Sequence, residues 1–176
     1  MIRRAFSGAG NRAFSRLEDS MEKTNSPAKE RLVTLFDAGT FVELGAYLRR
    51  PGHPEAESGV VCGYGAVEGR LIFAFAEDAA AMKGAVDAGH AAKIADLYEK
   101  ALRAGAPVIG MFDSAGAVVF DGAAALGGYA TLLSAAANAK GKIPQVAIIC
   151  GACVGTMAAV AGLFDFTVAV KNESRM

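Results

Sequence analysis

The sequence contains no tryptophan, only two histidines and three cysteines, and no excess of either charge. Eighteen basic residues balance eighteen acidic ones, which argues against nucleic acid or a membrane surface as a partner. The cysteines, Cys62, Cys150 and Cys153, are odd in number, and two of them follow or lie within apolar runs. We therefore expect reduced core thiols and a cytoplasmic location rather than a disulfide framework. A zinc site would need further ligands beside the Cys150–Cys153 pair.

Long uninterrupted apolar helices are also lacking. Residues 143–164 carry no charge and reach the length of a membrane span. Pro144 and Gln145 open this stretch, and Gly151 and Gly155 interrupt it. It is therefore predicted to form a buried strand followed by a buried helix, without a membrane span.

The amino-terminal residues lack acidic side chains. Residues 1–17 contain four arginines and two serines, a composition typical of a mitochondrial transit peptide. An ordinary basic helix or a leader fits the same residues, so the mitochondrial matrix stands as the alternative location. We treat residues 1–26 as a leader or helix and residues 27–176 as one domain.

Hydrophobic patterning predicts strands that alternate with helices. Ser26 and Pro27 indicate the start of a short helix, Glu68-Gly69 indicates a hairpin turn, and residues 49–58 are expected to form a polar loop. The expected helices are 27–36, 87–103, 122–139 and 156–163; the expected strands are 41–44, 60–67, 70–76, 107–112, 145–150 and 166–170. This order predicts a layered α/β fold with parallel pairing in its second half.

Two of the expected strands run into corners made of small residues. The first corner is Asp113-Ser114-Ala115-Gly116-Ala117, and the second is Gly151-Ala152-Cys153-Val154-Gly155. Small residues leave backbone N–H groups uncovered, and the start of the next helix adds partial positive charge. Such a corner suits an oxyanion hole, and hence chemistry at a carbonyl or thioester.

Several stretches, in order, resemble the amino-terminal domain of the acyl-CoA carboxyltransferase family, the carboxyltransferase subunits of biotin-dependent carboxylases and decarboxylases. The resemblance extends from about Pro27 to Met176. It is carried by Lys29-Glu30-Arg31-Leu32, Phe36-Asp37-Ala38-Gly39-Thr40, Gly63-Tyr64-Gly65, Glu68-Gly69-Arg70, Lys83-Gly84, Ile143-Pro144-Gln145, Asp165-Phe166 and the two corners.

The resemblance implies a crotonase-like fold of repeated strand–strand–helix units. Because residues 171–176 come directly after an apolar strand, where a covering helix usually follows, we expect this fold to be incomplete at its carboxyl end, either as a fragment or as a subunit that a partner completes. The resemblance also implies that the chain is the acyl-CoA-binding half of a biotin-dependent carboxyltransferase or decarboxylase. The thioester enolate would be held by the backbone N–H groups of Ala115 and Gly116. Carboxybiotin would arrive on a biotin carrier protein, and a second carboxyltransferase domain or subunit would complete the site in an oligomer.

The same resemblance gives further candidate substrate-binding residues: Lys83, Gly84, Gly151, Ala152 and Gly155. Lys83 could approach the phosphates of coenzyme A as a point charge, or could be a solvated lysine. Gly151 could line an acyl pocket, or could only permit close packing. No metal ligands are expected.

This sequence departs from the family pattern at two points. Ala115 stands where the family has a glycine, which leaves a usable backbone only if that position does not need positive φ. Thr156 follows Gly155 where a second glycine is usual. These departures keep two alternatives open: a non-catalytic assembly subunit that retains the fold, and another crotonase-fold coenzyme A enzyme.

A serine hydrolase is a further alternative, because Ser114 lies in the first corner. The surrounding residues do not form the Gly-x-Ser-x-Gly turn of such enzymes, and nothing places His53 or His90 beside Ser114. We expect Ser114 to bond to the backbone. We expect Asp113 to do likewise or to cap a loop, and Asp121 to cap the helix that follows it.

Overall fold

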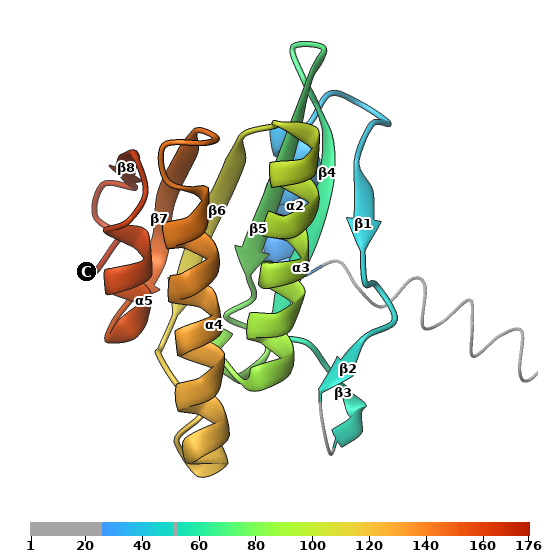
Figure 1. The fold of residues 1–176 in the computed structure, drawn as a ribbon. Coiled ribbons are helices and arrows are strands. Elements are labelled where there is room, and N and C mark those ends of the chain that lie inside the picture. Colours follow the sequence, from blue (N-terminus) through green and yellow to red (C-terminus); the bar gives the residue numbers. More distant parts are fainter. Residues whose placement is uncertain (1–25, 51–52) are drawn as a thin grey trace, which may run out of the picture.

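The computed structural model describes residues 26–50 and 53–176. Its main sheet has six strands in the order β1-β4-β5-β6-β7-β8 (Figure 1). The strands are β1 (Val42–Leu44), β4 (Val60–Val67), β5 (Arg70–Glu77), β6 (Val108–Ser114), β7 (Gln145–Cys153) and β8 (Phe166–Ala169). The helices are α2 (Pro27–Leu35), α3 (Ala88–Ala104), α4 (Ala123–Ala139) and α5 (Thr156–Ala161), with short 3₁₀ turns η1 (Met82–Gly84) and η2 (Val119–Asp121).

The predicted change from antiparallel to parallel pairing is confirmed. β1, β4 and β5 pair antiparallel, and β5, β6, β7 and β8 pair parallel. Parallel strands bring their carboxyl ends to one edge of the sheet, which we call the carboxyl edge. The glycine corners after β6 and β7 therefore lie side by side there, with η1 following β5 at the same edge.

Local signals define most of the element ends. The Ser26 hydroxyl accepts a hydrogen bond from the Lys29 N–H, and Pro27 occupies the first turn of α2. The Asp87 carboxylate caps α3 by accepting from the His90 N–H at 2.8 Å. Gly105, at φ 64°, ends that helix by donating to the carbonyls of its last turn.

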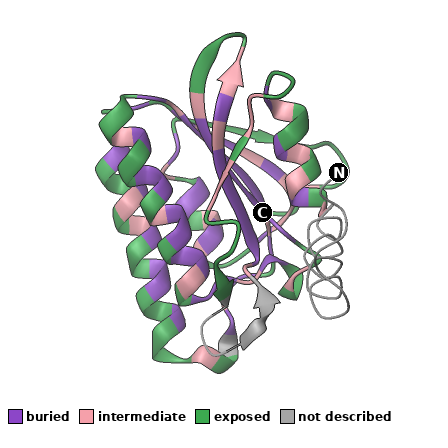
Figure 2. Ribbon diagram, turned by 90° about the vertical axis from the view of Figure 1, so that its right-hand side faces the viewer, coloured by how far each residue is buried: buried purple, intermediate pink, exposed green. Residues whose placement is uncertain are grey.

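Helices cover the two faces of the sheet unequally. α3, α4 and α5 pack on one face and bury their apolar sides toward it (Figures 1 and 2). The α2 helix covers part of the other face through Ala28, Leu32 and Phe36. The outer strand β8 is exposed along its length, although parallel strands of apolar sequence are usually covered on both faces.

Three predicted features are wrong in detail. Residues 49–58 are not simply a loop, because β2 (Arg49–Arg50) and β3 (His53–Glu57) pair antiparallel. Strands β6 and β7 run on to Ser114 and Cys153, since the two corners still pair with each other through these residues. The cap of α4 is Gly122, not Asp121, because η2 inserts a 3₁₀ turn before the helix.

The targeting and leader predictions concern the amino-terminal segment, of which residues 1–25 lie outside the described residues.

In the described ranges, no helix has the length and apolarity needed to cross a membrane. Residues 143–164 contain the strand β7 and the helix α5, as the glycines within this stretch predicted.

A buried polar pair lies between the carboxyl end of β5 and the start of α3. Glu77 is fully buried and His90 is 1% exposed, with 3.8 Å between Glu77 Oε1 and His90 Nε2. Burial, partly opposed by a hydrogen bond from the Asp113 N–H, raises the pKa of Glu77 to about 8. Burial, together with the nearby Lys93 charge, lowers the pKa of His90 to about 3. At neutral pH both side chains are therefore uncharged, and the contact is not an ion pair.

This pair predicts a pH-dependent stability that Glu77→Gln removes. The titration of His90 in the unfolded chain is common to the wild type and the variant, so it cancels when their pH profiles are compared. Above about pH 6.5 an unfolded glutamate is ionised, whereas folded Glu77 still holds its proton until the pH approaches 8. The free energy of unfolding of the wild type should fall by about 2 kcal/mol more than that of Glu77→Gln between about pH 6.5 and pH 8.5. Denaturant melts at a series of pH values measure this difference.

Glu99→Gln is the matched control, since Glu99 is 60% exposed on α3 and pairs with Arg103. It should leave the pH profile of the wild type unchanged. A Glu77→Gln profile parallel to that of the wild type would show that Glu77 titrates normally in the folded chain.

Candidate functional site

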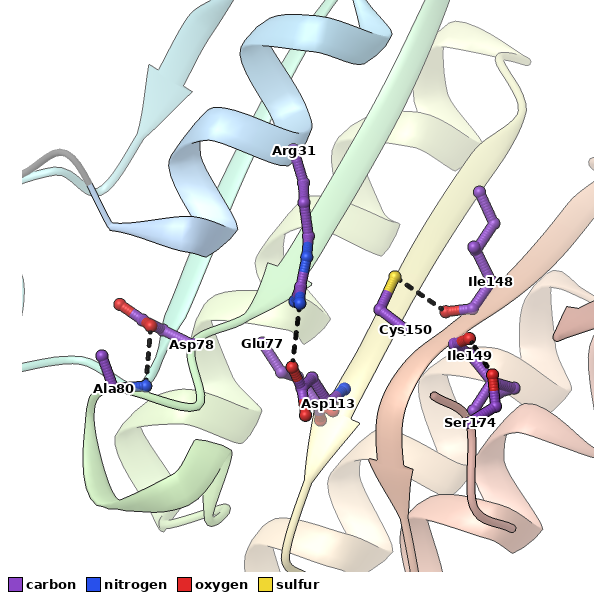
Figure 3. Close-up of polar contacts among 9 residues, drawn as sticks. All are labelled: Arg31, Glu77, Asp78, Ala80, Asp113, Ile148, Ile149, Cys150 and Ser174. Carbon is purple, nitrogen blue, oxygen red and sulfur yellow. Dashed lines mark hydrogen bonds and ion pairs between the residues drawn. The ribbon is translucent and has the colours of Figure 1, made fainter. Parts of the chain in front are cut away.

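Asp113, at the end of β6, is held on several sides. Arg31 reaches down from α2 and places Nη2 3.0 Å from Asp113 Oδ2 (Figure 3). The Asp113 N–H donates to Glu77 Oε2 at 2.9 Å. A Cβ added to Gly151 would lie 2.1 Å from Asp113 Oδ1. The expectation that the Asp113 side chain bonds to the backbone or caps a loop is therefore wrong: its carboxylate ties the sheet to α2.

That contact also bears on the alternatives for Gly151. Its Cα lies directly against the carboxylate of Asp113, so any side chain at this position would displace Asp113. Close packing thus accounts for this glycine. Ala152, the next residue, pairs with the end of the chain through a bridge to Arg175. Contacts within the protein therefore account for the positions of both Gly151 and Ala152.

The η1 turn packs directly on the first corner. A Cβ on Gly84 would lie 2.1 Å from the Asp113 carbonyl oxygen, and the Ser114 hydroxyl donates to the Gly84 carbonyl at 2.7 Å. Lys83 adopts φ 56° and its carbonyl accepts from the Ala115 N–H at 2.9 Å. Close packing therefore explains Gly84, while the Lys83 residue is exposed to solvent.

These contacts change which amides are available. The Ala115 N–H is bonded to Lys83, and the Gly116 N–H donates to the Ser114 hydroxyl at 3.2 Å. In this conformation neither of the two amides expected to hold a thioester oxygen is free. The acceptor for the Ala115 amide is the Lys83 carbonyl in η1, about thirty residues earlier in the chain. The sequence of the corner itself gives no indication of this contact.

The departure at Ala115 is tolerated. Ala115 does not have a positive φ, whereas Gly116 adopts φ 101°. The glycine that the turn requires is thus present, and the alanine occupies the position that does not require one.

The amides of Ala117, which the sequence analysis did not single out, and Gly155 have no acceptor among the residues that the structure describes. Gly155 caps α5 at φ 63° with open space where a Cβ would project. The two corners touch, because a Cβ on Gly116 would lie 3.8 Å from both the carbonyl oxygen and Cγ2 of Val154. The corners together therefore offer free N–H donors at the carboxyl edge of the sheet. Ala117 forms a parallel bridge with Val86, and the hydrogen bonds of that bridge are made by Gly116 and Val118, which leaves the Ala117 amide without an acceptor. No local pattern indicates this, because Val86 lies far earlier in the chain.

Nucleophilic chemistry has little support in this region. Ser114 is fully buried and both donates and accepts hydrogen bonds, as expected for a backbone-bonding serine. Burial raises the pKa of the Cys62 and Cys153 thiols to about 12, and in Cys153 the nearby Glu77 adds to the effect. Thiolates form only well above neutral pH at such sites. Within the described ranges, no cluster of three or more His, Cys, Asp or Glu side chains is arranged to hold a metal ion.

Comparison with known proteins supplies independent information. The chain is 39% identical over 168 residues to the methylmalonyl-CoA decarboxylase subunit alpha of Veillonella parvula, covering 92% of this chain and 33% of that protein. It is 35% identical over 184 residues to the mitochondrial propionyl-CoA carboxylase beta chain of Homo sapiens, covering 98% of this chain and 33% of that protein. The chain thus spans about a third of the length of these curated relatives.

A solved structure is also similar. The transcarboxylase 12S core, in a hexameric assembly with methylmalonyl-coenzyme A and methylmalonic acid bound, matches with a TM-score of 0.81 at 31% identity, over 90% of this chain and 32% of that one. The predicted crotonase-like architecture is confirmed by this likeness together with the six-stranded sheet. Residues 20–176 match the family described as the carboxyl transferase domain. The chain belongs to this carboxyl transferase domain family, whose members include carboxylase and decarboxylase subunits.

Proposed function

We propose that this chain binds a coenzyme A thioester and stabilises its enolate, as the acyl-CoA-binding part of a biotin-dependent carboxyltransferase or decarboxylase. The observation that supports this most directly is the pair of touching corners with free amides at Ala117 and Gly155. The names of the relatives support acyl-CoA as the substrate class.

The chemistry required of the chain is modest. Loss of carbon dioxide from an α-carboxylate, or loss of an α-proton, leaves an electron pair on the α-carbon of the thioester, and the enolate places its negative charge on the thioester oxygen. Backbone N–H groups that already point at this oxygen stabilise the charge without reorganisation. Loss of one such donor typically costs about 3 kcal/mol of barrier. In this proposal, the donors are Ala117 and Gly155, while Ala115 and Gly116 shape the corner that presents them.

The other predicted substrate-binding residues take different parts in the proposal. Lys83, exposed on η1, supplies positive charge for the coenzyme A phosphates. Gly84, Gly151 and Ala152 act on the substrate only through packing, because they set how closely the neighbouring turns approach.

Biotin enters as a co-substrate carried by another protein. When bound, carboxybiotin would donate the carboxyl group in one direction of the reaction, and biotin would accept it in the other. We assign no residue of this chain to it, because the free donors of the two corners are used by the acyl-CoA. A biotin carrier protein, a second carboxyltransferase domain or subunit and an oligomeric assembly remain part of the proposal, and the hexamer assembly of the similar transcarboxylase core supports the last of these.

A non-catalytic assembly subunit is the second candidate. It is favoured by one observation, the internal hydrogen bonds of the Ala115 and Gly116 amides. Such a subunit would keep the fold and would not distinguish an acyl thioester from free coenzyme A.

Gly155→Ala tests the proposal. The added methyl group would project into the open space beside the Gly155 amide, where the acyl group would lie. In calorimetric titrations, we expect the wild type to bind propionyl-CoA more tightly than coenzyme A. The variant should lose about tenfold in affinity for the thioester, equivalent to about 1.4 kcal/mol.

Gly141→Ala is the matched control for backbone strain. Gly141 also has positive φ and open space around it, but it lies before β7, at the opposite edge of the sheet. It should leave the affinity unchanged. If the wild type binds propionyl-CoA no better than coenzyme A, the assembly subunit becomes the better interpretation.

Gly151→Ala should behave differently from Gly155→Ala. The new Cβ would collide with the Asp113 carboxylate and disturb its pair with Arg31. We expect a loss of about 2 kcal/mol in the free energy of unfolding, typical of overpacking, measured by urea denaturation. An unchanged stability together with weakened propionyl-CoA binding would show instead that Gly151 lines the acyl pocket.

A further inference from the structure

The ring of Tyr129 lies in the core, and its hydroxyl lies beside the first corner. The residue lies on α4, its side chain belongs to the main hydrophobic cluster, and it is only 6% exposed. A Cβ built on Gly116 would lie 3.7 Å from the Tyr129 hydroxyl oxygen and 3.8 Å from the Val154 carbonyl oxygen. The hydroxyl, the first corner and the second corner therefore surround one small region at the carboxyl edge.

In the described part of the chain no residue accepts or donates a hydrogen bond to this hydroxyl, and its oxygen is not among the fully enclosed unpaired side-chain atoms. The ring is therefore buried while the hydroxyl is open to solvent, where a bound ligand can take its hydrogen bond. Tyr98, on the neighbouring helix α3, is the internal comparison, since its hydroxyl donates to Gln145 Oε1 at 2.8 Å. The fold thus satisfies one buried phenol and leaves the other directed at the corner.

The neighbouring groups keep this hydroxyl a donor. Burial, and to a smaller degree the charge of Glu77, raises the pKa of Tyr129 to about 12. The proton therefore stays on the phenol at every pH at which the protein works. A neutral donor beside the two corners, whose Ala117 and Gly155 amides have no acceptor in the described part of the chain, favours an anionic oxygen over a cation or an apolar group.

We propose that Tyr129 is a substrate-contacting residue whose hydroxyl donates a hydrogen bond to an anionic oxygen of the acyl group between the two corners. This inference rests on the proposed function and adds a side-chain donor to its backbone donors. Two oxygens share the required chemistry: the thioester oxygen and the carboxylate that is gained or lost at the α-carbon.

Tyr129→Phe tests the proposal, because it keeps the buried ring and removes only the hydroxyl. Calorimetric titrations of the full chain with methylmalonyl-CoA, propionyl-CoA and coenzyme A separate the two oxygens. The first two ligands differ only by the carboxylate, and the third has no acyl group. We expect about a tenfold loss of affinity for methylmalonyl-CoA, in line with a hydrogen bond to a charged group, and no change for coenzyme A.

The propionyl-CoA titration identifies the oxygen. A loss for both thioesters indicates the thioester oxygen, and a loss for methylmalonyl-CoA alone indicates the carboxylate; either supports the proposal. Tyr47→Phe makes the same chemical change on a residue that is 82% exposed, and it should alter none of the three affinities.

Other results would overturn the inference. Unchanged thioester binding by Tyr129→Phe, while the wild type distinguishes thioesters from coenzyme A, would reject the role of Tyr129 and leave the proposed function intact. An equal loss for all three ligands would indicate a structural effect and would likewise reject it. A wild type that does not distinguish the ligands would reject the proposed function first, and the role of Tyr129 with it.

Discussion

The tie between Arg31 and Asp113 is the contact on which the arrangement of the carboxyl edge depends. Asp113 sits at the end of the central strand β6, with its carboxylate paired to α2 and its amide bonded to Glu77. Glycines at 84 and 151 allow two neighbouring segments to approach its backbone and side chain within contact distance. The carboxylate is mostly buried, so loss of its partner would leave a poorly solvated charge. One residue thereby fixes the position of the corner that follows it.

This constraint separates the amides of the corner into two groups. The first two, Ala115 and Gly116, bond within the protein and hold the turn against η1 and Ser114. Ala117 bridges to Val86, but Gly116 and Val118 make the hydrogen bonds of that bridge, so the Ala117 amide has no acceptor among the described residues. A preorganised donor needs such anchoring, because a mobile amide would lose its orientation when charge develops. The hydrogen bonds of the Ala115 and Gly116 amides would thus hold the Ala117 amide in a fixed position.

Polar groups are satisfied very differently at the two edges of the sheet. At the amino end of β7, Gln145 is fully engaged: Tyr98 donates to its side-chain oxygen, its amide group donates to Ala136, and its N–H donates to Asp165. The buried unpaired side-chain atoms in the described ranges belong to Arg31, Ser58, Glu77 and His90. Arg31 and His90 reach the carboxyl edge from helices, through their contacts with Asp113 and Glu77. Unsatisfied buried polar groups are uncommon in folded proteins and often mark sites of function.

Much of the architecture was predictable from local patterns. The cap at Ser26-Pro27, the turn at Glu68-Gly69 and the αL end of α3 at Gly105 follow from residue types alone, because each depends on neighbours within a few positions. Parallel pairing followed from the alternation of strands and helices. The resemblance to the carboxyltransferase family was also visible in the sequence, because the family's motifs occur in the same order along the chain. What local patterns missed were the β2–β3 pairing and the continuation of β6 and β7 through their corners, both of which depend on partners elsewhere in the chain.

The sequence by itself determined where the corners lie, which residues in them are small, and that they end parallel strands. Only the tertiary structure decided which amides are free, because the acceptor for Ala115 comes from η1 and the conformation at Gly116 depends on packing across two turns. It also decided that Gly84 and Gly151 serve close packing, and that Glu77, His90 and Tyr129 converge on the same edge. Hydrogen bonds and burial between segments far apart in sequence leave no periodic signal, and they are visible only once the sheet brings those segments together.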